Sequence, residues 1–171
     1  LVPAGYERIP DLFSTGVDST GTPLGGGVAD PHYSLTVDPS GLGAATVPAD
    51  GFPIPPWIGN DSTSAWIGPD DGNDANGPPG SYTYETTFSL ANFDPDEAVI
   101  NGLVATDNDL LDILLNGTST GISSSGFADF VPFSIDSGFA SDTNTLQFVV
   151  NNGAPTGPTG LRVSLSGFAQ A

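Results

Sequence analysis

Four oxygen-bearing side chains crowd into one short stretch of the sequence, and side chains of this kind can bind a metal ion. They belong to Asp107, Asn108, Asp109 and Asp112. Calcium takes about six to eight hard oxygen ligands, and clustered carboxylates and amides supply them. We therefore predict a calcium site here. The alternative is a solvated acidic loop, because the sequence holds 20 acidic residues against two basic ones.

A second cluster of the same residue types is a second candidate for metal binding. It comprises Asp70, Asp71, Asn73, Asp74 and Asn76. The segment matches the calcium loop of helix-loop-helix proteins only in part. Asp74, Asn76 and Gly77 fit that pattern, but Gly72 stands where its first aspartate belongs. A solvated loop is again the alternative.

Groups for catalysis are scarce in this sequence. His32 is the only imidazole, there is no cysteine, and no serine stands in the context of a nucleophile elbow. A carboxylate pair for glycoside hydrolysis is conceivable among Asp107, Asp109, Asp112 and Glu85. Carboxylates are so frequent here, however, that such a pair carries little weight. We therefore expect a non-catalytic protein.

The two tryptophans could stack on sugar rings. Trp57 follows two prolines, and we predict that it is the exposed, sugar-stacking residue. Trp66 lies in a strand-like Ser-Ala-Trp-Ile segment. A tryptophan in that setting is more often part of the core, with its indole N–H paired to a carbonyl group. We therefore predict that Trp66 is buried.

Strands must position these side chains. Residues 99–105 form an apolar run with β-branched side chains, residues 113–115 form another, and the acidic turn lies between them. Asn116-Gly117 follows the second run and favours the positive φ angles of a tight hairpin. A helix over residues 109–115 would be too short to be stable alone. We interpret the unit as the central strand pair of a β-sandwich, with the acidic turn at one end of the sheets.

The rest of the chain also predicts strands. Alternating segments rich in β-branched and aromatic residues are separated by glycine- and proline-marked turns. We predict an all-β fold, an antiparallel β-sandwich with strands at residues 82–90, 99–105, 113–115, 146–150 and 161–165. Residues 14–171 form a single domain, which at this length can bury a core.

The first 13 residues are predicted to form an extended N-terminal arm. Pro3 and Pro10 exclude a helix and a central strand. The arm carries five apolar side chains that need burial, those of Val2, Tyr6, Ile9, Leu12 and Phe13. An edge strand of the same domain would bury them, and so would strand addition to a neighbouring subunit. We favour the neighbour, in a homo-polymer, and take the five residues as candidate subunit contacts.

The charge of the chain restricts its partners. The net charge is −18, with Arg8 and Arg162 as the only basic residues and no lysine. Such a surface repels phosphate groups, so nucleic acid and anionic membranes are poor partners, whereas cations are attracted. No segment has the apolar length of a membrane span. The absence of cysteine excludes disulfides and thiolate zinc sites.

Four segments in this order resemble the galactose-binding-like jelly roll: YETTFSL (84–90), ATDN (105–108), DILLNG (112–117) and NTLQF (144–148). In that family an aromatic-bearing strand precedes a strand that ends in an acidic turn, and a hairpin and an Asn-Thr-Leu strand follow. The resemblance covers residues 81–168. It implies a jelly-roll β-sandwich, with the first acidic cluster at the end of the sheets.

The whole chain also resembles secreted bacterial proteins of the PEP-CTERM type. The segments that carry this resemblance are GFPIPPW (51–57), NDSTSAWI (60–67) and GLRVSLSG (160–167). The resemblance implies export from a bacterium and assembly at the cell surface. We expect a mature, processed chain whose C-terminal sorting tail, which would begin at Ala171, has been removed.

Two functions remain open. The first is a secreted, non-catalytic structural subunit of an extracellular filament, surface layer or biofilm matrix, which assembles through sandwich edges and the arm and is stabilised by calcium. The second is a calcium-assisted carbohydrate-binding module for an extracellular polysaccharide, favoured by the jelly-roll resemblance and the two tryptophans. We favour the first, because a binding module usually accompanies a catalytic domain and none is present in this sequence.

Overall fold

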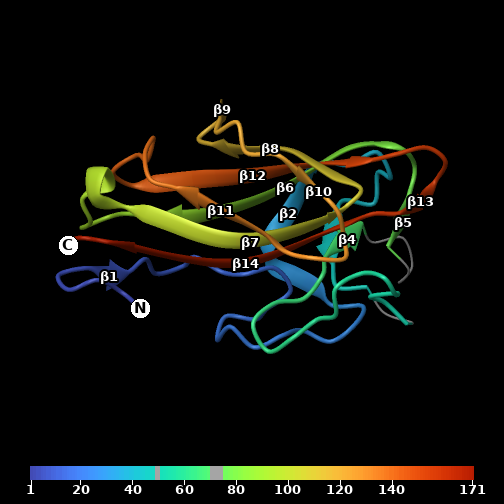
Figure 1. Ribbon diagram of the computed structural model, residues 1–171, viewed down its shortest axis with the longest axis horizontal. Coiled ribbons are helices and arrows are strands. Elements are labelled where there is room, and N and C mark those ends of the chain that lie inside the picture. The colour runs from blue at the N-terminus through green and yellow to red at the C-terminus, as the bar shows by residue number, and fades with distance from the viewer. Residues whose placement is uncertain (49–50, 70–74) are drawn as a thin grey trace.

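In the computed structural model, which describes residues 1–48, 51–69 and 75–171, two antiparallel β-sheets pack face to face (Figure 1). The first sheet has the strand order β1 (Glu7–Arg8), β14 (Gly160–Ala169), β7 (Val99–Asp107) and β11 (Val131–Ile135). The second has the order β10 (Ser124–Ser125), β8 (Asp109–Leu115), β12 (Thr143–Asn152), β6 (Gly80–Ser89), β2 (Ala29–Val37), β3 (Ala44–Thr46) and β4 (Gly68–Pro69), and β9 (Thr118–Ser119) pairs with β8. The predicted all-β, antiparallel β-sandwich is confirmed.

Two small elements complete the fold. β5 (Asn76–Gly77) pairs with β13 (Gly157–Pro158) and forms a short two-stranded ribbon. A 3-10 turn, η1 (Pro95–Glu97), precedes β7, and the Asp94 side chain caps it by accepting a hydrogen bond from the backbone N–H of Asp96. None of the helical structure in the described ranges is long and apolar enough to cross a membrane.

The five predicted strands are present, and each is longer than predicted, although β6 ends at Ser89, one residue before its predicted end. The clearest case is the ladder between β12 and β6, which runs from Thr143 opposite Ser89 to Asn152 opposite Gly80. Backbone pairing continues past the apolar residues because an antiparallel ladder needs only N–H and C=O groups. The apolar pattern therefore locates the strands and underestimates their length.

The core lies between the two sheets because inward and outward side chains alternate along each long strand. On β12, Leu146, Phe148 and Val150 are buried, and the residues between them are half-exposed. The other sheet contributes Ile100 and Val163, which are also fully buried. Aromatic residues of β6 fill the middle of this core, with Tyr82 and Tyr84 both inaccessible to solvent.

The strands on either side of the acidic turn lie in different sheets, so they are not the central pair that we predicted. β7 pairs with β14 and β11, whereas β8 pairs with β12. Asn108 alone separates the two strands, and one residue is too short for a hairpin loop. The chain therefore crosses from one sheet to the other at this point, which does lie at one end of the sheets.

The predicted Asn116-Gly117 hairpin is present at the far end of β8. Leu115 pairs with Thr118, and the two turn residues have positive φ angles of 51° and 79°. Both angles are those of the tight two-residue turn that this dipeptide favours.

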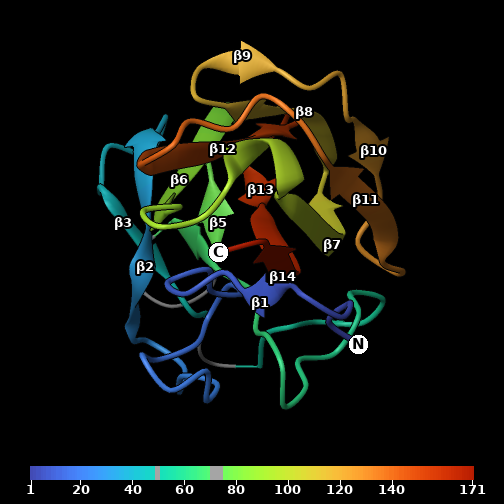
Figure 2. The same ribbon diagram turned by 90° about the vertical axis from the view of Figure 1, so that its left-hand side faces the viewer.

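The N-terminal arm lies against the sandwich of its own chain. β1 pairs with the edge of β14, with Glu7 opposite Ala169 and Arg8 opposite Phe168, and Figure 2 shows β1 directly below β14. The backbone N–H of Ile9 donates to the carbonyl of Gly167 at 3.1 Å. Pro3 and Pro10 lie on either side of this short pairing, so neither interrupts it.

The apolar side chains of the arm also have partners in the same chain. Ile9 is 5% exposed, Tyr6 packs edge-on against Phe168, Leu12 packs against the core and Phe13 stacks on His32 at 3.7 Å between ring centroids. Val2 is half-buried. The arm thus forms the edge strand of its own domain, the alternative to strand addition, and its docking on a neighbouring subunit stays a prediction.

Candidate ligand-binding site

The ends of three strands come together around the acidic turn. β7 ends at Asp107, β8 begins at Asp109, and β12 brings Asn151 opposite Asp109. They surround a cavity of about 680 Å³, here called the end pocket. Its lining residues are Asp107, Asn108, Asp109, Phe127, Asn151, Asn152, Gly153, Ala154, Pro155, Thr156, Gly157 and Pro158.

Asp107 is the most buried carboxylate of the end pocket, at 7% exposed. Its Oδ2 accepts a hydrogen bond from the indole Nε1 of Trp57 at 2.8 Å, and its backbone carbonyl accepts one from the hydroxyl of Thr159 at 2.7 Å. Burial raises the pKa of the Asp107 carboxyl, the bond from Trp57 opposes that rise, and the charge of Asp109 adds to it. The indole thus supports a carboxylate that water reaches poorly.

Asn108 forms hydrogen bonds with the end of β12 and with the loop that follows it. Its Oδ1 accepts a hydrogen bond from the backbone N–H of Gly153 at 2.6 Å, and its own N–H donates to the carbonyl of Asn151 at 2.9 Å. A Cβ atom at position 153 would lie 3.3 Å from that same Oδ1, so glycine suits this close approach. The peptide bond between Asp107 and Asn108 is cis.

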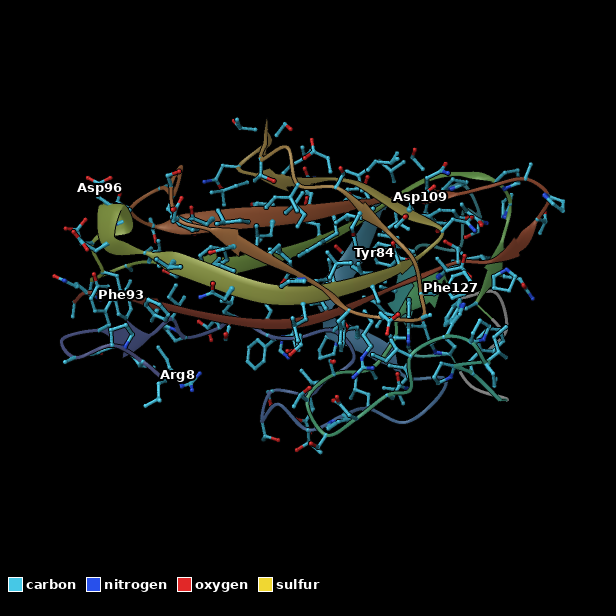
Figure 3. The ribbon with its side chains drawn as sticks, in the orientation of Figure 1. Arg8, Tyr84, Phe93, Asp96, Asp109 and Phe127 are labelled. Atoms are coloured by element: carbon cyan, nitrogen blue, oxygen red, sulfur yellow. The ribbon has the colours of Figure 1, made fainter. Side chains whose placement is uncertain are left out.

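Asp109, Phe127 and Asn151 are half-buried residues of the end pocket. Figure 3 shows Asp109 and Phe127 at the same end, opposite to Phe93 and Asp96. Among the described residues, none forms a hydrogen bond with the carboxylate of Asp109 or the side-chain amide of Asn151. Both polar groups are therefore open to a ligand, next to an aromatic ring.

An aromatic cluster formed by Phe52, Trp57 and Trp66 lies beneath the end pocket. Trp57 has a role in it that we did not predict. Trp57 is 6% exposed, lies 4.3 Å from Trp66 between ring centroids, and contacts Phe52 edge-on. The prediction of an exposed, sugar-stacking Trp57 is therefore wrong, because its indole N–H is needed by Asp107. Trp66 is buried as predicted, and its Nε1 donates to the carbonyl of Ile58 at 2.8 Å.

Arg162 of β14 holds the segment that carries both tryptophans. Its side chain is buried, its Nε donates to the hydroxyl of Ser64 at 2.9 Å, and it also donates to the carbonyl of Gly59. The guanidinium pairs with Asp61 at 2.9 Å and lies over the ring of Phe130, 4.6 Å from its centroid. This network supports the aromatic cluster beneath the end pocket, and Arg162 does not line the pocket itself.

The predicted four-residue calcium cluster is not assembled at one place. Asp107, Asn108 and Asp109 line the end pocket, whereas Asp112 lies further along β8, opposite Val149. One oxygen each of Asp107 and Asn108 already accepts a hydrogen bond. In the ranges that the structure describes, no group of three or more acidic, histidine or cysteine side chains could hold a metal ion. Calcium binding by Asp107, Asn108, Asp109 and Asp112 stays a prediction.

The second predicted metal cluster lies largely outside the described residues. Asp70, Asp71, Asn73 and Asp74 belong to the segment that is not described. Asn76 is described, in β5, opposite Pro158 of β13. Calcium binding by this cluster stays a prediction.

Sequence reasoning missed Phe127, Asn151 and the loop of residues 153–158. The Asn-Asn-Gly end of a strongly apolar strand was the available signal, since such residues mark a turn. What the sequence did not contain was the pairing of β12 with β8, and this pairing brings Asn151 to Asp109.

Comparison with known proteins gives one structural similarity. No protein-family model matches the chain, and no curated protein matches it. Among solved structures, it is similar to the structure of CBM35 from Paenibacillus barcinonensis, at 18% sequence identity and a TM-score of 0.42, over 79% of this chain and 94% of that chain. A similarity of this size does not transfer a ligand or a binding site to the present chain.

Proposed function

We propose that this chain is a non-catalytic carbohydrate-binding module that binds a glycan in the end pocket. The observation that carries the proposal is the meeting of a half-buried phenylalanine ring, Phe127, with the open polar groups of Asp109 and Asn151 in one cavity. A sugar presents both hydroxyl groups and apolar ring faces. A carboxylate accepts hydroxyl hydrogen bonds, an amide donates and accepts them, and an aromatic ring contacts the apolar face.

The rim of the end pocket is held in place before a ligand arrives. Asn108 binds the N–H of Gly153, and the amide of Asn152 donates to the carbonyls of Gly77 and Pro78 at 2.8 and 3.2 Å. Two prolines further restrict the loop of residues 153–158. A rim fixed in this way loses little conformational freedom on binding, which favours affinity.

The test is binding to a glycan array followed by calorimetry with a bound oligosaccharide. We expect Phe127→Ala to weaken binding at least about tenfold, which corresponds to a lost contact of about 1.4 kcal/mol. Phe139→Ala is the matched control, because Phe139 is also half-buried but packs on Phe88, outside the end pocket. Equal effects of the two substitutions, or no binding to any glycan, would contradict the proposal. We also expect no release of reducing ends from the bound glycan.

The structural-subunit function has lost one of its supports, since the arm packs on its own sandwich. Assembly into a homo-polymer stays a prediction, and sedimentation of the purified chain would test it. An extracellular or cell-surface location in a bacterium belongs to the carbohydrate-binding proposal, and the PEP-CTERM resemblance of residues 51–57, 60–67 and 160–167 supports it.

A further inference from the structure

The positive charges of this chain are few enough to be located one by one. The sequence contains two arginines, one histidine and no lysine. A carbohydrate that carries a carboxylate needs such a cation, or a hydrogen-bond donor, where its charge is desolvated. The positions of Arg8, Arg162 and His32 therefore show whether the end pocket offers a cation to an acidic sugar.

None of the three side chains lines the end pocket. Arg8 lies on β1, opposite Phe168, and Figure 3 shows it at the other end of the molecule from Asp109 and Phe127. Arg162 is buried and paired with Asp61. His32 belongs to β2 and stacks on Phe13. The end pocket instead contains two carboxylates, those of Asp107 and Asp109.

We infer that the end pocket selects neutral and amine-bearing sugars and rejects uronic acids, with Asp109 as the residue that determines this specificity. The inference rests on the proposed carbohydrate-binding function. A hydroxyl or ammonium group donates to the open carboxylate of Asp109, whereas a sugar carboxylate has no hydrogen to donate at neutral pH and meets like charge. Burial of an unpaired charge adds a desolvation penalty.

The experiment compares hexasaccharides in three charge forms. Each of the gluco, galacto and manno series is supplied as the neutral sugar, the amino sugar and the uronic acid, and binding to the full chain is measured by calorimetry at low salt with a chelator present. For a series whose neutral form binds, we expect the amino form to bind roughly two- to fivefold more tightly, as for an exposed ion pair. We expect the uronic acid to bind at least about tenfold more weakly.

Two variants distinguish the effect of a charge in the end pocket from the effect of the overall charge of the chain. Asp109→Asn removes one negative charge in the end pocket, and Asp96→Asn removes one at η1, at the opposite end (Figure 3). We expect Asp109→Asn to abolish the preference for the amino sugar and to relax the rejection of the uronic acid. We expect Asp96→Asn to leave both unchanged, because Asp96 lies at the opposite end of the molecule and contacts no ligand in the end pocket.

The possible failures are distinguishable. No binding in any series would contradict the proposed function, and this inference with it. Binding of a uronic acid as tightly as its neutral counterpart, or only after calcium is added, would overturn the inference and leave the proposed function standing. Equal effects of Asp109→Asn and Asp96→Asn would also overturn it, because the preference would then be a property of the whole surface.

Discussion

Asp107 lies at the boundary between the aromatic cluster and the end pocket, and a single indole group supports its charge. The bond from Trp57 is the side-chain hydrogen bond that its carboxylate accepts among the described residues. A buried carboxylate needs such donors, because without them it is stabilised only by protonation. The two residues are far apart in the sequence, so no local motif could have indicated the pair.

Trp57→Phe is expected to destabilise the fold by about 1–3 kcal/mol, because it leaves a buried acceptor without its donor. The pKa of Asp107 should rise further in this variant, since the bond that opposes the effect of burial is gone. Urea unfolding measures the first effect and NMR titration the second. In an Asp107→Asn background, Trp57→Phe should lower the free energy of unfolding by less. If the effects of the two substitutions are instead additive in this double-mutant cycle, the pairing of Trp57 with Asp107 is contradicted.

Asp61 gives the fold a pH dependence of definite sign. Partial burial alone would raise its pKa, but hydrogen bonds from Thr63 and the charge of Arg162 lower it to about 2, from an ordinary value of 3.8. Its stabilising contribution is therefore complete above about pH 5 and is lost progressively as the pH falls through about 2, down to about pH 1. The side chain is 52% exposed, so solvent screens the pair and the contribution is small.

We expect Asp61→Asn to lower the free energy of unfolding by up to about 1 kcal/mol near pH 6, and by much less near pH 2, where this carboxyl is about half protonated. Urea unfolding at both pH values, beside Asp96→Asn as a control for general charge, checks this. A loss that is the same at both pH values would show that the Asp61 carboxylate charge is not what matters.

At the scale of strands, the sequence predicts the elements better than their partners. The alternating segment around Tyr84 and the Asn116-Gly117 hairpin are confirmed because period and turn chemistry are local properties. The sheet to which each strand belongs depends on contacts between distant residues. The β7–β8 pair was therefore misassigned, and Asn151 was not associated with Asp109 until the ladder between β12 and β8 was known.

The arm is an edge strand of its own sheet, so its apolar residues should act on stability rather than on assembly. Ile9→Ala removes a side chain that is 5% exposed, and we expect a loss of about 2–5 kcal/mol in the free energy of unfolding. Leu1→Ala is the control in the same segment, because Leu1 is fully exposed and should have no effect. Unchanged stability of Ile9→Ala, together with a smaller oligomer in sedimentation, would restore the arm as a subunit contact.

At the scale of the whole molecule, the net charge of −18 opposes compaction. Its 20 acidic residues are opposed by only two arginines, of which one is buried and paired with Asp61. Repulsion among the surface carboxylates is strongest at low salt and is screened over about 10 Å at 0.1 M ionic strength. The folded state keeps these charges closer together than the unfolded chain does, so screening favours folding.

We therefore expect the melting temperature to rise with NaCl, and to rise equally with MgCl₂ and CaCl₂ when the two are compared at the same ionic strength. Differential scanning calorimetry with each salt, before and after addition of a chelator, checks this expectation. Screening does not distinguish the two divalent ions, whereas a calcium site would stabilise the fold by mass action only when calcium is present. A larger effect of calcium that persists in Asp109→Asn and Asp112→Asn would place the ion at the cluster of residues 70–76. The same excess, if lost in those two variants, would show that Asp109 and Asp112 bind calcium, as the sequence predicts.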